Sequence, residues 1–377
     1  MGKKKDSLEL YFHIPFCIKK CDYCDFLSGP ATRAGQEAYI YALLREMKAA
    51  SAIEKRTVDT VFIGGGTPSV PECGIMEKLL QGIGKNFQLA ADAEVTIEAN
   101  PGTLTPEKLA LYRRYGINRI SIGLQSPENQ ELRALGRIHN YQQFLESYHM
   151  AREAGFSNIN IDLMFAIPGQ SYEGWIQNLR TVAKLGPEHI SAYSLIIEEG
   201  TPFSARKLDL PDEDTEYRMY EDVAAVLGKY GYYQYEISNY AKKDRNCRHN
   251  EGYWQRKDYL GLGLGAASLV GRERFTNTSD MSEYLENSGN LEKIRTDRET
   301  LTREDEMGEF MFLGLRMTKG VSKKDFQEYF GTSIEKIYGE VLEKYKKQGL
   351  LLEEEGRICL SRAGIHVSNA VMADFLL

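Results

Sequence analysis

The 377-residue sequence has no apolar run near the length of a membrane-spanning helix, no excess of basic residues and few cysteines. A spanning helix needs about 20 mostly apolar residues, so we expect no membrane span. A net charge of −7 and a pI near 5.6 exclude a general electrostatic attraction to nucleic acid. Six cysteines with short spacings do not resemble a secreted disulfide scaffold. The three lysines of residues 1–6 precede a strand-like run, 8–14, that is too short for a signal-peptide core. We therefore expect a cytoplasmic protein in which Cys73, Cys247 and Cys359 remain ordinary thiols.

Six apolar, β-branched runs alternate with amphipathic segments through the first half of the chain. The expected strands are residues 8–14, 58–63, 94–99, 119–124, 158–165 and 189–195, and the expected helices are residues 36–53, 74–83, 106–115, 141–154 and 172–185. This alternation predicts an α/β fold with right-handed βαβ units and a parallel sheet. Polar or glycine-rich residues follow nearly every strand, and barrel enzymes assemble their site at these strand ends. We therefore favour a partial (β/α)6 barrel over an open doubly wound sheet.

The length of the chain predicts a large domain and a smaller one. We assign residues 1–200 to the barrel, 201–300 to an extension of it, and 301–377 to a small C-terminal helical, winged-helix-like domain. Residues 302–377 carry 11 Lys and Arg against 13 Asp and Glu, so the basic footprint of a DNA-binding winged helix is missing. We expect a docking or lid domain and no nucleic-acid partner.

Three cysteines after the first expected strand form the pattern Cys-x3-Cys-x2-Cys at Cys17, Cys21 and Cys24. Thiolates this close together suit one compact iron–sulfur or zinc centre. Three ligands would leave one iron of a four-iron cluster free to bind a small molecule. The alternative is a closed structural zinc site, in which His13 completes a Cys3His set.

Two further features lie at the ends of expected strands. Residues 64–68, Gly-Gly-Gly-Thr-Pro, allow a carboxylate or phosphate to approach the backbone, although a tight turn also explains the glycines. Glu98 and Asp162 interrupt apolar strands, and carboxylates rarely bury without a partner. They are either structural ion pairs with Arg119 or Arg137, or hydrogen-bond acceptors for a bound ligand. Their place at the strand ends favours the ligand.

His249 lies in a charged, aromatic segment with Arg245, Arg248, Tyr253 and Trp254. Imidazole ligates haem iron and guanidinium groups pair with carboxylates such as the haem propionates, so this segment is a candidate haem site. The plainer interpretation is a histidine on a loop that is solvated or hydrogen-bonded.

The cysteine spacing resembles that of the radical S-adenosylmethionine (SAM) superfamily, and the other motifs resemble one branch of it. That branch holds oxygen-independent coproporphyrinogen III oxidase and the HemW haem chaperones. The resemblance rests on Tyr11-x-His-Ile-Pro-Phe-Cys17, the glycine turn with Ser69, Ile97-Glu98-Ala-Asn100-Pro, and residues 121–126, 135–139, 160–164, 167–170, 235–239 and 248–253. It covers nearly the whole chain.

In this superfamily three cysteines hold a 4Fe–4S cluster, and the fourth iron binds the amino and carboxylate groups of SAM. The resemblance therefore implies that Cys17, Cys21 and Cys24 are cluster ligands. It implies SAM contacts at Tyr11, Tyr23, Gly65, Gly66, Thr67, Glu98, Gln125, Arg137 and Asp162, with Ile196 as a further match.

Two departures separate the chaperones from the oxidase within this branch. The oxidase has a further cysteine two residues beyond the third ligand, where this chain has Phe26, and a long N-terminal extension, where this chain has 16 residues before Cys17. The chaperones share both departures and the motif His249-Asn-x-x-Tyr253, which that family links to haem. The resemblance thus implies a haem chaperone without an assigned catalytic residue, which passes haem to acceptor haem proteins, respiratory and membrane-associated ones among them. It also implies a homodimer stabilised by the cluster and a peripheral contact with the membrane. Oxidative decarboxylation of coproporphyrinogen is the alternative function.

Overall fold

The six expected strands form one parallel sheet in the computed structural model, which describes residues 7–376. They are β1 (Ser7–Ile14), β2 (Thr57–Gly65), β3 (Leu89–Ala99), β4 (Arg119–Gln125), β5 (Ile159–Phe165) and β6 (His189–Ser194). Each pairs in parallel with the next along the chain. The prediction of right-handed βαβ units around a parallel sheet is therefore confirmed in its strands and their order.

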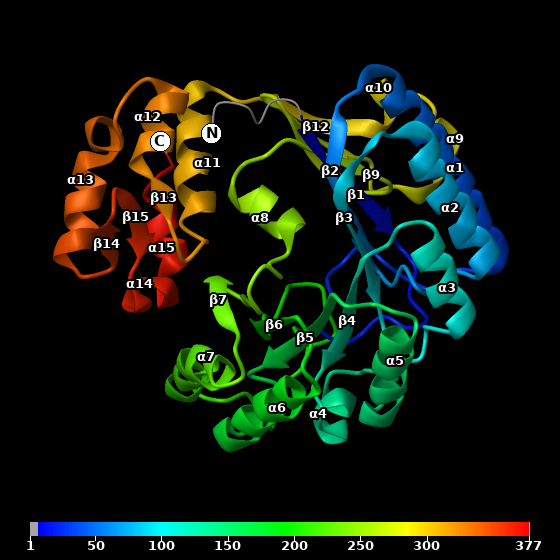
Figure 1. Ribbon diagram of the computed structural model, residues 1–377, viewed down its shortest axis with the longest axis horizontal. Coiled ribbons are helices and arrows are strands. Elements are labelled where there is room, and N and C mark those ends of the chain that lie inside the picture. The colour runs from blue at the N-terminus through cyan, green and yellow to red at the C-terminus, as the bar shows by residue number, and fades with distance from the viewer. Residues whose placement is uncertain (1–6, 377) are drawn as a thin grey trace.

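Helices between the strands cover the outer face of the sheet (Figure 1). They are α1 (Arg33–Ile53), α2 (Cys73–Asn86), α3 (Pro106–Arg114), α4 (Asn129–Ala134), α5 (Tyr141–Glu153) and α6 (Tyr172–Leu185). The sequence did not predict α4, which has only six residues. Side-chain caps fix several helix starts: the Ser171 hydroxyl, for example, accepts a hydrogen bond from Gly174 N at the start of α6. Alternate strand residues such as Leu10 and Phe12 are fully buried in one core with these helices.

The inner face of the same sheet is mostly polar. The inward-facing residues are Glu9, Tyr11 and His13 on β1, Thr60 and Phe62 on β2, Glu94, Thr96 and Glu98 on β3, Arg119 and Ser121 on β4, Asn160 and Asp162 on β5, and His189 and Ser191 on β6. Many hydrogen-bond to one another across the strands, as Asn160 does with Ser121 and His189. The interior of a barrel is normally filled with apolar side chains. The polar side chains that line this one therefore indicate that a functional site lies inside the barrel.

Residues 201–300 extend the sheet at both of its edges. The elements are α7 (Glu213–Gly228), β7 (Tyr233–Glu236), β8 (Asn239–Ala241), α8 (Arg248–Trp254), β9 (Tyr259–Leu262), β10 (Ala267–Val270), β11 (Glu273–Asn277), α9 (Met281–Asn287), α10 (Leu291–Ile294) and β12 (Arg295–Thr300). The strand order is β12-β11-β10-β9-β1-β2-β3-β4-β5-β6-β8-β7. Among residues 7–376 the edge strands β12 and β7 do not pair with each other, so the barrel is partial.

Helix α8 lies inside the curve of this sheet (Figure 1). The expectation of a loop around His249 is wrong, because residues 248–254 are helical. The helix is held by its first turn, where His249 N donates to the Glu94 carboxylate at 3.2 Å. It also approaches β1 closely: a Cβ on Gly252 would lie 1.9 Å from Glu9 Oε1. A glycine at this point therefore lets α8 pack directly against the inner face of the sheet.

The C-terminal part of the chain forms a second core. Its elements are α11 (Arg303–Gly314), β13 (Val321–Ser322), α12 (Lys323–Phe330), α13 (Ile334–Lys347), β14 (Leu351–Glu354), β15 (Arg357–Leu360), α14 (Arg362–His366) and α15 (Ser368–Ala373). Three helices followed by the β14–β15 hairpin give the expected winged-helix-like order. The buried residues of this core include Phe326, Phe330 and Tyr338. It contacts the barrel extension through hydrogen bonds such as Ile237 N to Arg316 O at 3.1 Å.

None of the helices within residues 7–376 is long and apolar enough to cross a membrane. The lysines of residues 1–6, which entered the signal-peptide argument, lie outside the described residues.

Candidate functional site

The three cysteines of the motif line one cavity at the carboxyl ends of the strands. Cys17, Cys21 and Cys24 lie on the loop after β1 and border a cavity of about 130 Å³. All three thiols are free and partly exposed. The loop is tied down at its start, where Cys17 N donates to Gly29 O at 2.9 Å. The fold therefore brings the three thiols to the border of one cavity. Among the described residues no three His, Cys, Asp or Glu side chains are arranged closely enough to hold a single metal ion, so the thiols would have to move together to ligate one centre.

A glycine turn at the end of β2 packs directly on this loop. Gly65 has a φ of 109°, in the region that favours glycine, and a Cβ there would lie 2.6 Å from the His13 ring. A Cβ on Gly66 would lie 2.8 Å from Phe16 O. Thr67 N completes the contact by donating to Phe16 O at 2.7 Å. The tight-turn explanation of these glycines is thus correct, and the same turn also borders the cysteine cavity.

Glu98, at the end of β3, is a partly exposed carboxyl group on the wall of this cavity. Its Oε2 accepts a hydrogen bond from Gly65 N at 3.1 Å. Burial, reinforced by the charge of Asp162, raises the pKa of Glu98 from 4.5 to about 8. Ionising this carboxyl group costs free energy when no cation is near it. A cationic ligand bound beside it would stabilise the ionised form, so the site favours such a ligand.

Asp162, on β5, completes a pair of carboxyl groups at this end of the barrel. It accepts hydrogen bonds from Ser121 Oγ at 3.1 Å and Asn160 Nδ2 at 2.7 Å. Burial raises its pKa in spite of these bonds. Within the described residues neither Glu98 nor Asp162 forms the ion pair with Arg119 or Arg137 that the structural alternative requires.

Arg137 instead connects the cysteine loop to two strand ends. Its Nη1 lies 3.5 Å from Cys21 Sγ, and its Nη2 donates to Asn100 Oδ1 at 2.7 Å and to Gly123 O at 2.6 Å. Its Nε is buried and has no hydrogen-bond partner among the described residues. Arg137 therefore ties the cysteine loop to Asn100, just after β3, and to Gly123 on β4.

Two other predicted residues, Gln125 and Tyr23, also lie at this site. The first has an unusual backbone conformation, and the second is strongly desolvated. Gln125 ends β4 with a φ of 70°, a conformation that side-chain-bearing residues rarely adopt and that clusters at functional sites. Its side chain lies near Gly123, where an added Cβ would be 3.3 Å from Gln125 Nε2. Burial strongly raises the pKa of Tyr23, so its hydroxyl remains protonated beside the cysteines.

The structure brings eight of the predicted SAM-contacting residues to the cysteine cavity. They are Tyr23, Gly65, Gly66, Thr67, Glu98, Gln125, Arg137 and Asp162. Ile196, just after β6, is 66% exposed and does not border this cavity. Tyr11 lies deeper along β1 and borders a different cavity. His249 is also remote from the cysteine cavity, inside the barrel.

His249 is 1% exposed and has both ring nitrogens in hydrogen bonds. Nδ1 lies 2.7 Å from Thr60 Oγ1, and Nε2 lies 3.0 Å from Tyr253 Oη. The ring stacks on Phe62 with 5.2 Å between centroids. Burial and the charge of Arg119 lower the pKa of His249 to about 3, which keeps the imidazole neutral. Its ring must leave Tyr253 before Nε2 can coordinate a metal.

Sequence reasoning gave no role to Asn100 and assigned His13 only as a zinc ligand. Asn100 Nδ2 donates to Thr67 Oγ1 at 2.8 Å while its Oδ1 accepts from Arg137, so it links two predicted site residues. The signal was present, since Asn100 is the polar residue that follows β3. His13 instead hydrogen-bonds Leu27 O at 2.8 Å through Nε2 and lies 3.1 Å from Tyr11 Oη through Nδ1. With both nitrogens engaged, His13 supports the cysteine loop and does not complete a Cys3His set.

The donor groups around the cavity fit an iron–sulfur cluster with SAM. Three thiols suit iron, and Arg137 Nη1 lies 3.5 Å from Cys21 Sγ. The carboxyl groups of Glu98 and Asp162, which border the cavity, suit the ammonium and ribose hydroxyls that SAM carries. These are the residues that would hold the two groups in this chain.

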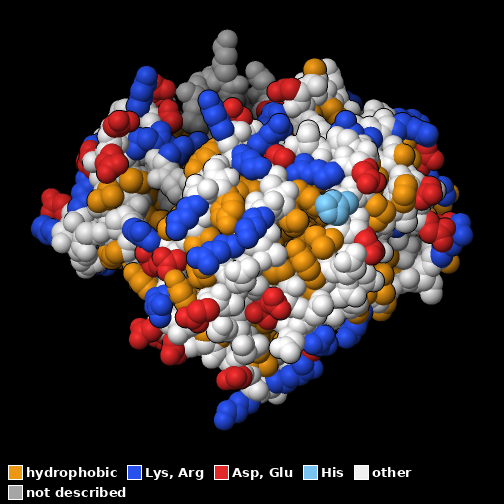
Figure 2. Space-filling model, turned by 60° about the horizontal axis from the view of Figure 1, so that its bottom comes forward, with side chains coloured by type: hydrophobic (Ala, Val, Ile, Leu, Met, Phe, Trp, Pro, Cys, Tyr) orange, Lys and Arg blue, Asp and Glu red, His pale blue; other side chains and the backbone are white. Residues whose placement is uncertain are grey.

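Several large hydrophobic side chains are exposed near this site, whose lining also includes Lys19 and Lys20. Ile18, Phe26, Leu27, Ile138 and Ile196 are all exposed large hydrophobic residues near the strand ends. Phe26, at the position where the oxidase has a cysteine, borders the cysteine cavity and is 60% exposed. Figure 2 shows hydrophobic side chains gathered on one face of the molecule with lysines and arginines around them.

Two family models match parts of the chain. Residues 11–182 match the Radical SAM superfamily, and residues 301–367 match the HemN C-terminal domain. The first match contains the cysteine loop, the glycine turn and both carboxylates. The second contains α11 and the winged-helix-like core.

Curated relatives match nearly the whole length. The chain is similar to the heme chaperone HemW of Lactococcus lactis, with 38% identity over 371 residues that make up 97% of each chain. It is similar to the heme chaperone HemW of Escherichia coli, with 38% identity over 362 residues that make up 93% of each. Among solved structures it resembles the coproporphyrinogen III oxidase HemN of Escherichia coli, with a TM-score of 0.88 and 24% identity over 99% of this chain and 90% of that one. The structural likeness carries the fold alone and confirms the partial barrel with its C-terminal domain.

Proposed function

The chain belongs to the HemW family of the radical SAM superfamily, and from this membership we propose that it is a haem chaperone that carries a 4Fe–4S cluster and SAM. The identity of 38% over 97% of a heme chaperone is the observation that carries the proposal. The geometry supports it because the three thiols and eight of the predicted SAM-contacting residues share one cavity.

In this proposal Cys17, Cys21 and Cys24 hold the cluster, and Arg137 stabilises the bound Cys21 thiolate. The cavity-lining residues Glu98, Asp162 and the Gly65–Thr67 turn bind and orient SAM. SAM and the cluster, when bound, supply one-electron chemistry. Tyr11 and Ile196, which do not line this cavity, remain proposed contacts that depend on how far SAM extends beyond it.

The cargo is haem, and the partners are haem proteins that receive it. His249 and the α8 segment are the proposed point of haem contact, with His249 reaching the metal only after it leaves Tyr253. Some acceptor proteins lie in membranes, so a reversible peripheral contact with the membrane is part of the proposal. A homodimer, stabilised by the cluster, is a further part of it.

The second candidate is the coproporphyrinogen III oxidase reaction. The shared fold favours it, but a likeness at 24% identity extends to the fold only. Phe26 stands where the oxidase has a cysteine, and α8 lies inside the curve of the sheet. We therefore expect no conversion of coproporphyrinogen.

A single anaerobic experiment tests the proposal. The reconstituted full-length chain is titrated with haem, mixed with a haem-free acceptor haem protein, and assayed in parallel with coproporphyrinogen and SAM. Stoichiometric haem binding followed by transfer to the acceptor supports the chaperone function. Conversion of coproporphyrinogen without haem binding would establish the oxidase in its place.

A further inference from the structure

The side-chain amide of Asn100 connects two of the three cysteines of the cluster motif. Asn100 directly follows β3 and borders the cysteine cavity. Its Oδ1 accepts a hydrogen bond from Arg137 Nη2 at 2.7 Å, and its Nδ2 donates to Thr67 Oγ1 at 2.8 Å. A guanidinium group can only donate, so Arg137 requires the amide oxygen and leaves the amide nitrogen for Thr67. The orientation of the amide is therefore fixed by its two partners.

Both partners of Asn100 also contact a cysteine sulfur. Thr67 Oγ1 lies 3.5 Å from Cys17 Sγ. Because this oxygen accepts the hydrogen bond from Asn100, its own proton is available for Cys17. On the other side, Arg137 Nη1 lies 3.5 Å from Cys21 Sγ. One side chain thus connects Cys17 to Cys21 through two hydrogen-bond donors.

The position of Asn100 is itself fixed by the turn that follows β3. Thr103 donates twice to Asn100 O, from its N at 3.1 Å and from its Oγ1 at 2.6 Å. Asn100 N donates to Ser69 Oγ at 3.4 Å. Gly123, on β4, leaves room for the contact with Arg137, because a Cβ there would lie 2.9 Å from Asn100 Oδ1. A side chain held in this way has few positions of its own, so it can orient its neighbours.

We propose, on the basis of the proposed cluster site, that Asn100 is a positioning residue for the iron–sulfur cluster. It holds the Thr67 hydroxyl on Cys17 as the thiols move together around iron. Through the other end of the same amide it holds the Arg137 guanidinium on Cys21. Asn100 contacts neither sulfur itself and acts through these two donors.

The consequence is a cluster that accepts an electron more readily. Reduction adds one electron to the cluster and neither forms nor breaks a bond, so the reduced cluster carries one more negative charge. Hydrogen bonds and positive charge at the ligand sulfurs stabilise that charge and raise the reduction potential. Within residues 7–376 no side chain donates a hydrogen bond to the sulfur of Cys24, so the effect comes through Cys17 and Cys21.

Reductive titration of the reconstituted, SAM-free full-length chain with dithionite, followed by electron paramagnetic resonance, tests this role. Asn100→Leu has nearly the shape of asparagine but no polar side-chain atom, so it removes both orienting hydrogen bonds. We expect the reduction equilibrium to shift at least tenfold towards the oxidised cluster, which is about 59 mV for a one-electron couple. The iron–sulfur stretching bands of the cysteine ligands should also shift in the resonance Raman spectrum, because two sulfurs lose oriented donors.

Three other substitutions act on the same contacts. Arg137→Gln and Thr67→Val each remove one donor, so each should shift the equilibrium in the same direction. Thr67→Ser keeps the hydroxyl and should restore the wild-type equilibrium and Raman bands, which a packing role of Thr67 would not predict. Gly123→Ala keeps every polar group but presses a Cβ on Asn100 Oδ1, so it should give a smaller shift of the same sign. If Asn100→Leu takes up no cluster, Gly123→Ala decides the test.

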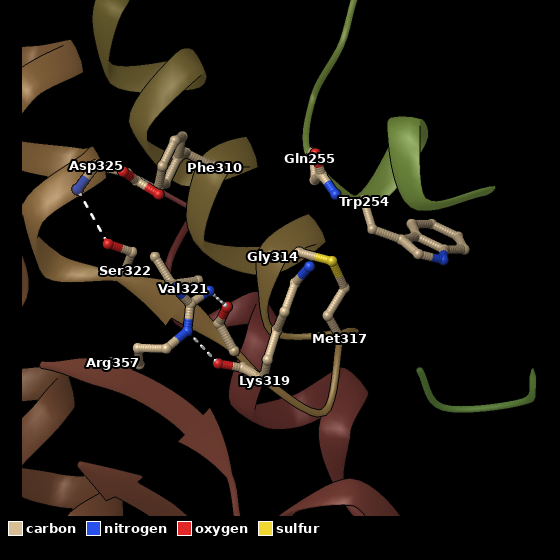
Figure 3. A pocket seen from close by; sticks show the side chains of 11 residues that line it. Trp254, Gln255, Phe310, Gly314, Met317, Lys319, Val321, Ser322, Asp325 and Arg357 are labelled. Carbon is tan, nitrogen blue, oxygen red and sulfur yellow. Dashed lines mark hydrogen bonds between the residues drawn. The ribbon is translucent and has the colours of Figure 1, made fainter. Parts of the chain in front are cut away.

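Two matched controls lose similar hydrogen bonds far from the cysteines. Asn118 accepts from Val95 N at 2.9 Å and donates to Ala93 O at 2.7 Å, so Asn118→Leu should lower the free energy of unfolding and leave the reduction equilibrium unchanged. Arg357 Nε donates to the backbone oxygen of Lys319 at 2.6 Å, and Figure 3 shows Arg357 among the residues that line a separate cavity of about 180 Å³. Within the described residues that cavity shares no lining residue with the cysteine cavity, so Arg357→Gln should also leave the equilibrium unchanged.

The outcomes separate this inference from the proposed function. If wild type binds the cluster and Asn100→Leu has the wild-type equilibrium and Raman bands, the inference is wrong while the proposed cluster site stands. A shift in Asn118→Leu as large as that in Asn100→Leu would also overturn it, because the equilibrium would then respond to any lost hydrogen bond. If wild type takes up no iron and sulfide, the proposed function itself fails.

Discussion

Replacing Glu98 by glutamine should stabilise the SAM-free protein and weaken SAM binding at the same time. Desolvation of the carboxyl group raises its pKa from the ordinary value of 4.5 to about 8. Glutamine has nearly the same shape and keeps an oxygen that accepts the hydrogen bond from Gly65 N. It cannot ionise, so it removes the cost of a buried charge and also the attraction for an ammonium group.

The direction of the stability effect follows from proton linkage. Because the folded chain binds this proton more tightly than the unfolded chain, the penalty is absent below pH 4.5 and grows as the pH rises to 8. The pKa is 4.5 in the unfolded chain and about 8 in the folded chain. At pH 7 this difference lowers the free energy of unfolding by about 3 kcal/mol. Glu98→Gln should recover most of that, and the gain over wild type should vanish near pH 4.5.

The effect on SAM has the opposite sign. A charge-assisted hydrogen bond contributes about 1.5–3 kcal/mol, so its loss should raise the dissociation constant for SAM roughly 10- to 150-fold. SAM binding to wild type requires the ionised carboxylate, so affinity should rise about tenfold between pH 6 and pH 7. Binding should release close to one proton at these pH values.

Two measurements test these effects. Urea unfolding of the SAM-free protein across pH 5 to 8 measures the change in stability. Calorimetry of SAM binding in two buffers of different ionisation enthalpy measures the SAM affinity and the number of protons released. Glu286→Gln, at an exposed position of α9, is a control that should change neither. A Glu98→Gln protein that is less stable than wild type at pH 7, with unchanged SAM affinity, would show that Glu98 is structural and that the reasoning is wrong.

Three further predictions concern metal, the glycine turn and catalysis. Cys17→Ser, Cys21→Ser and Cys24→Ser should each remove the iron and sulfide of anaerobically purified protein, measured chemically, whereas Cys73→Ser, Cys247→Ser and Cys359→Ser should not; stoichiometric zinc without sulfide would contradict this. Gly65→Ala should lower the free energy of unfolding by at least about 1 kcal/mol, because its φ is 109° and the new Cβ would lie 2.6 Å from His13. Gly74→Ala, in open space on α2, should not destabilise, and equal urea midpoints for the two variants would refute the turn argument. Wild type should not convert coproporphyrinogen, and chromatographic detection of the decarboxylated product in the absence of haem binding would reverse the functional proposal.

Much of the barrel was predictable because each strand can be recognised from its own short stretch of sequence. In β3 and β5 apolar residues alternate with polar ones, and glycines or polar residues follow the strand ends. The sequence therefore predicts both the strands and the edge of the sheet at which the site lies, which is the edge formed by their carboxyl ends. The cysteine spacing has the same character, since three ligands lie within eight residues of one another. Glu98 and Asp162 were identified because an ionisable residue in an apolar strand needs an explanation.

The position of α8 was not predictable in this way. Its seven residues are too few and too polar to show a helical period, and what fixes them is long-range: Glu94 caps the first turn, and Gly252 allows contact with Glu9. The same limit applies to Tyr11. Its motif suggests a SAM contact, but whether a side chain in the middle of β1 borders one cavity or another depends on how the barrel is filled from inside.

The filling of the barrel also connects the cysteine loop with the cavity that Tyr11 borders. Tyr11 lies on the wall of this second cavity, and its hydroxyl lies 3.1 Å from His13 Nδ1, while His13 Nε2 hydrogen-bonds the backbone of the cysteine loop at Leu27. Tyr11 also stacks on Phe62, and Phe62 stacks on His249. A packed interior transmits displacement because its side chains have few alternative positions. A chain of side-chain contacts along β1 therefore joins the cysteine loop to the wall of this second cavity, although the two cavities use separate residues. Because His249 and the cluster ligands are separate residues, haem binding is expected to survive Cys17→Ser, Cys21→Ser and Cys24→Ser, as measured by absorbance titration with haemin.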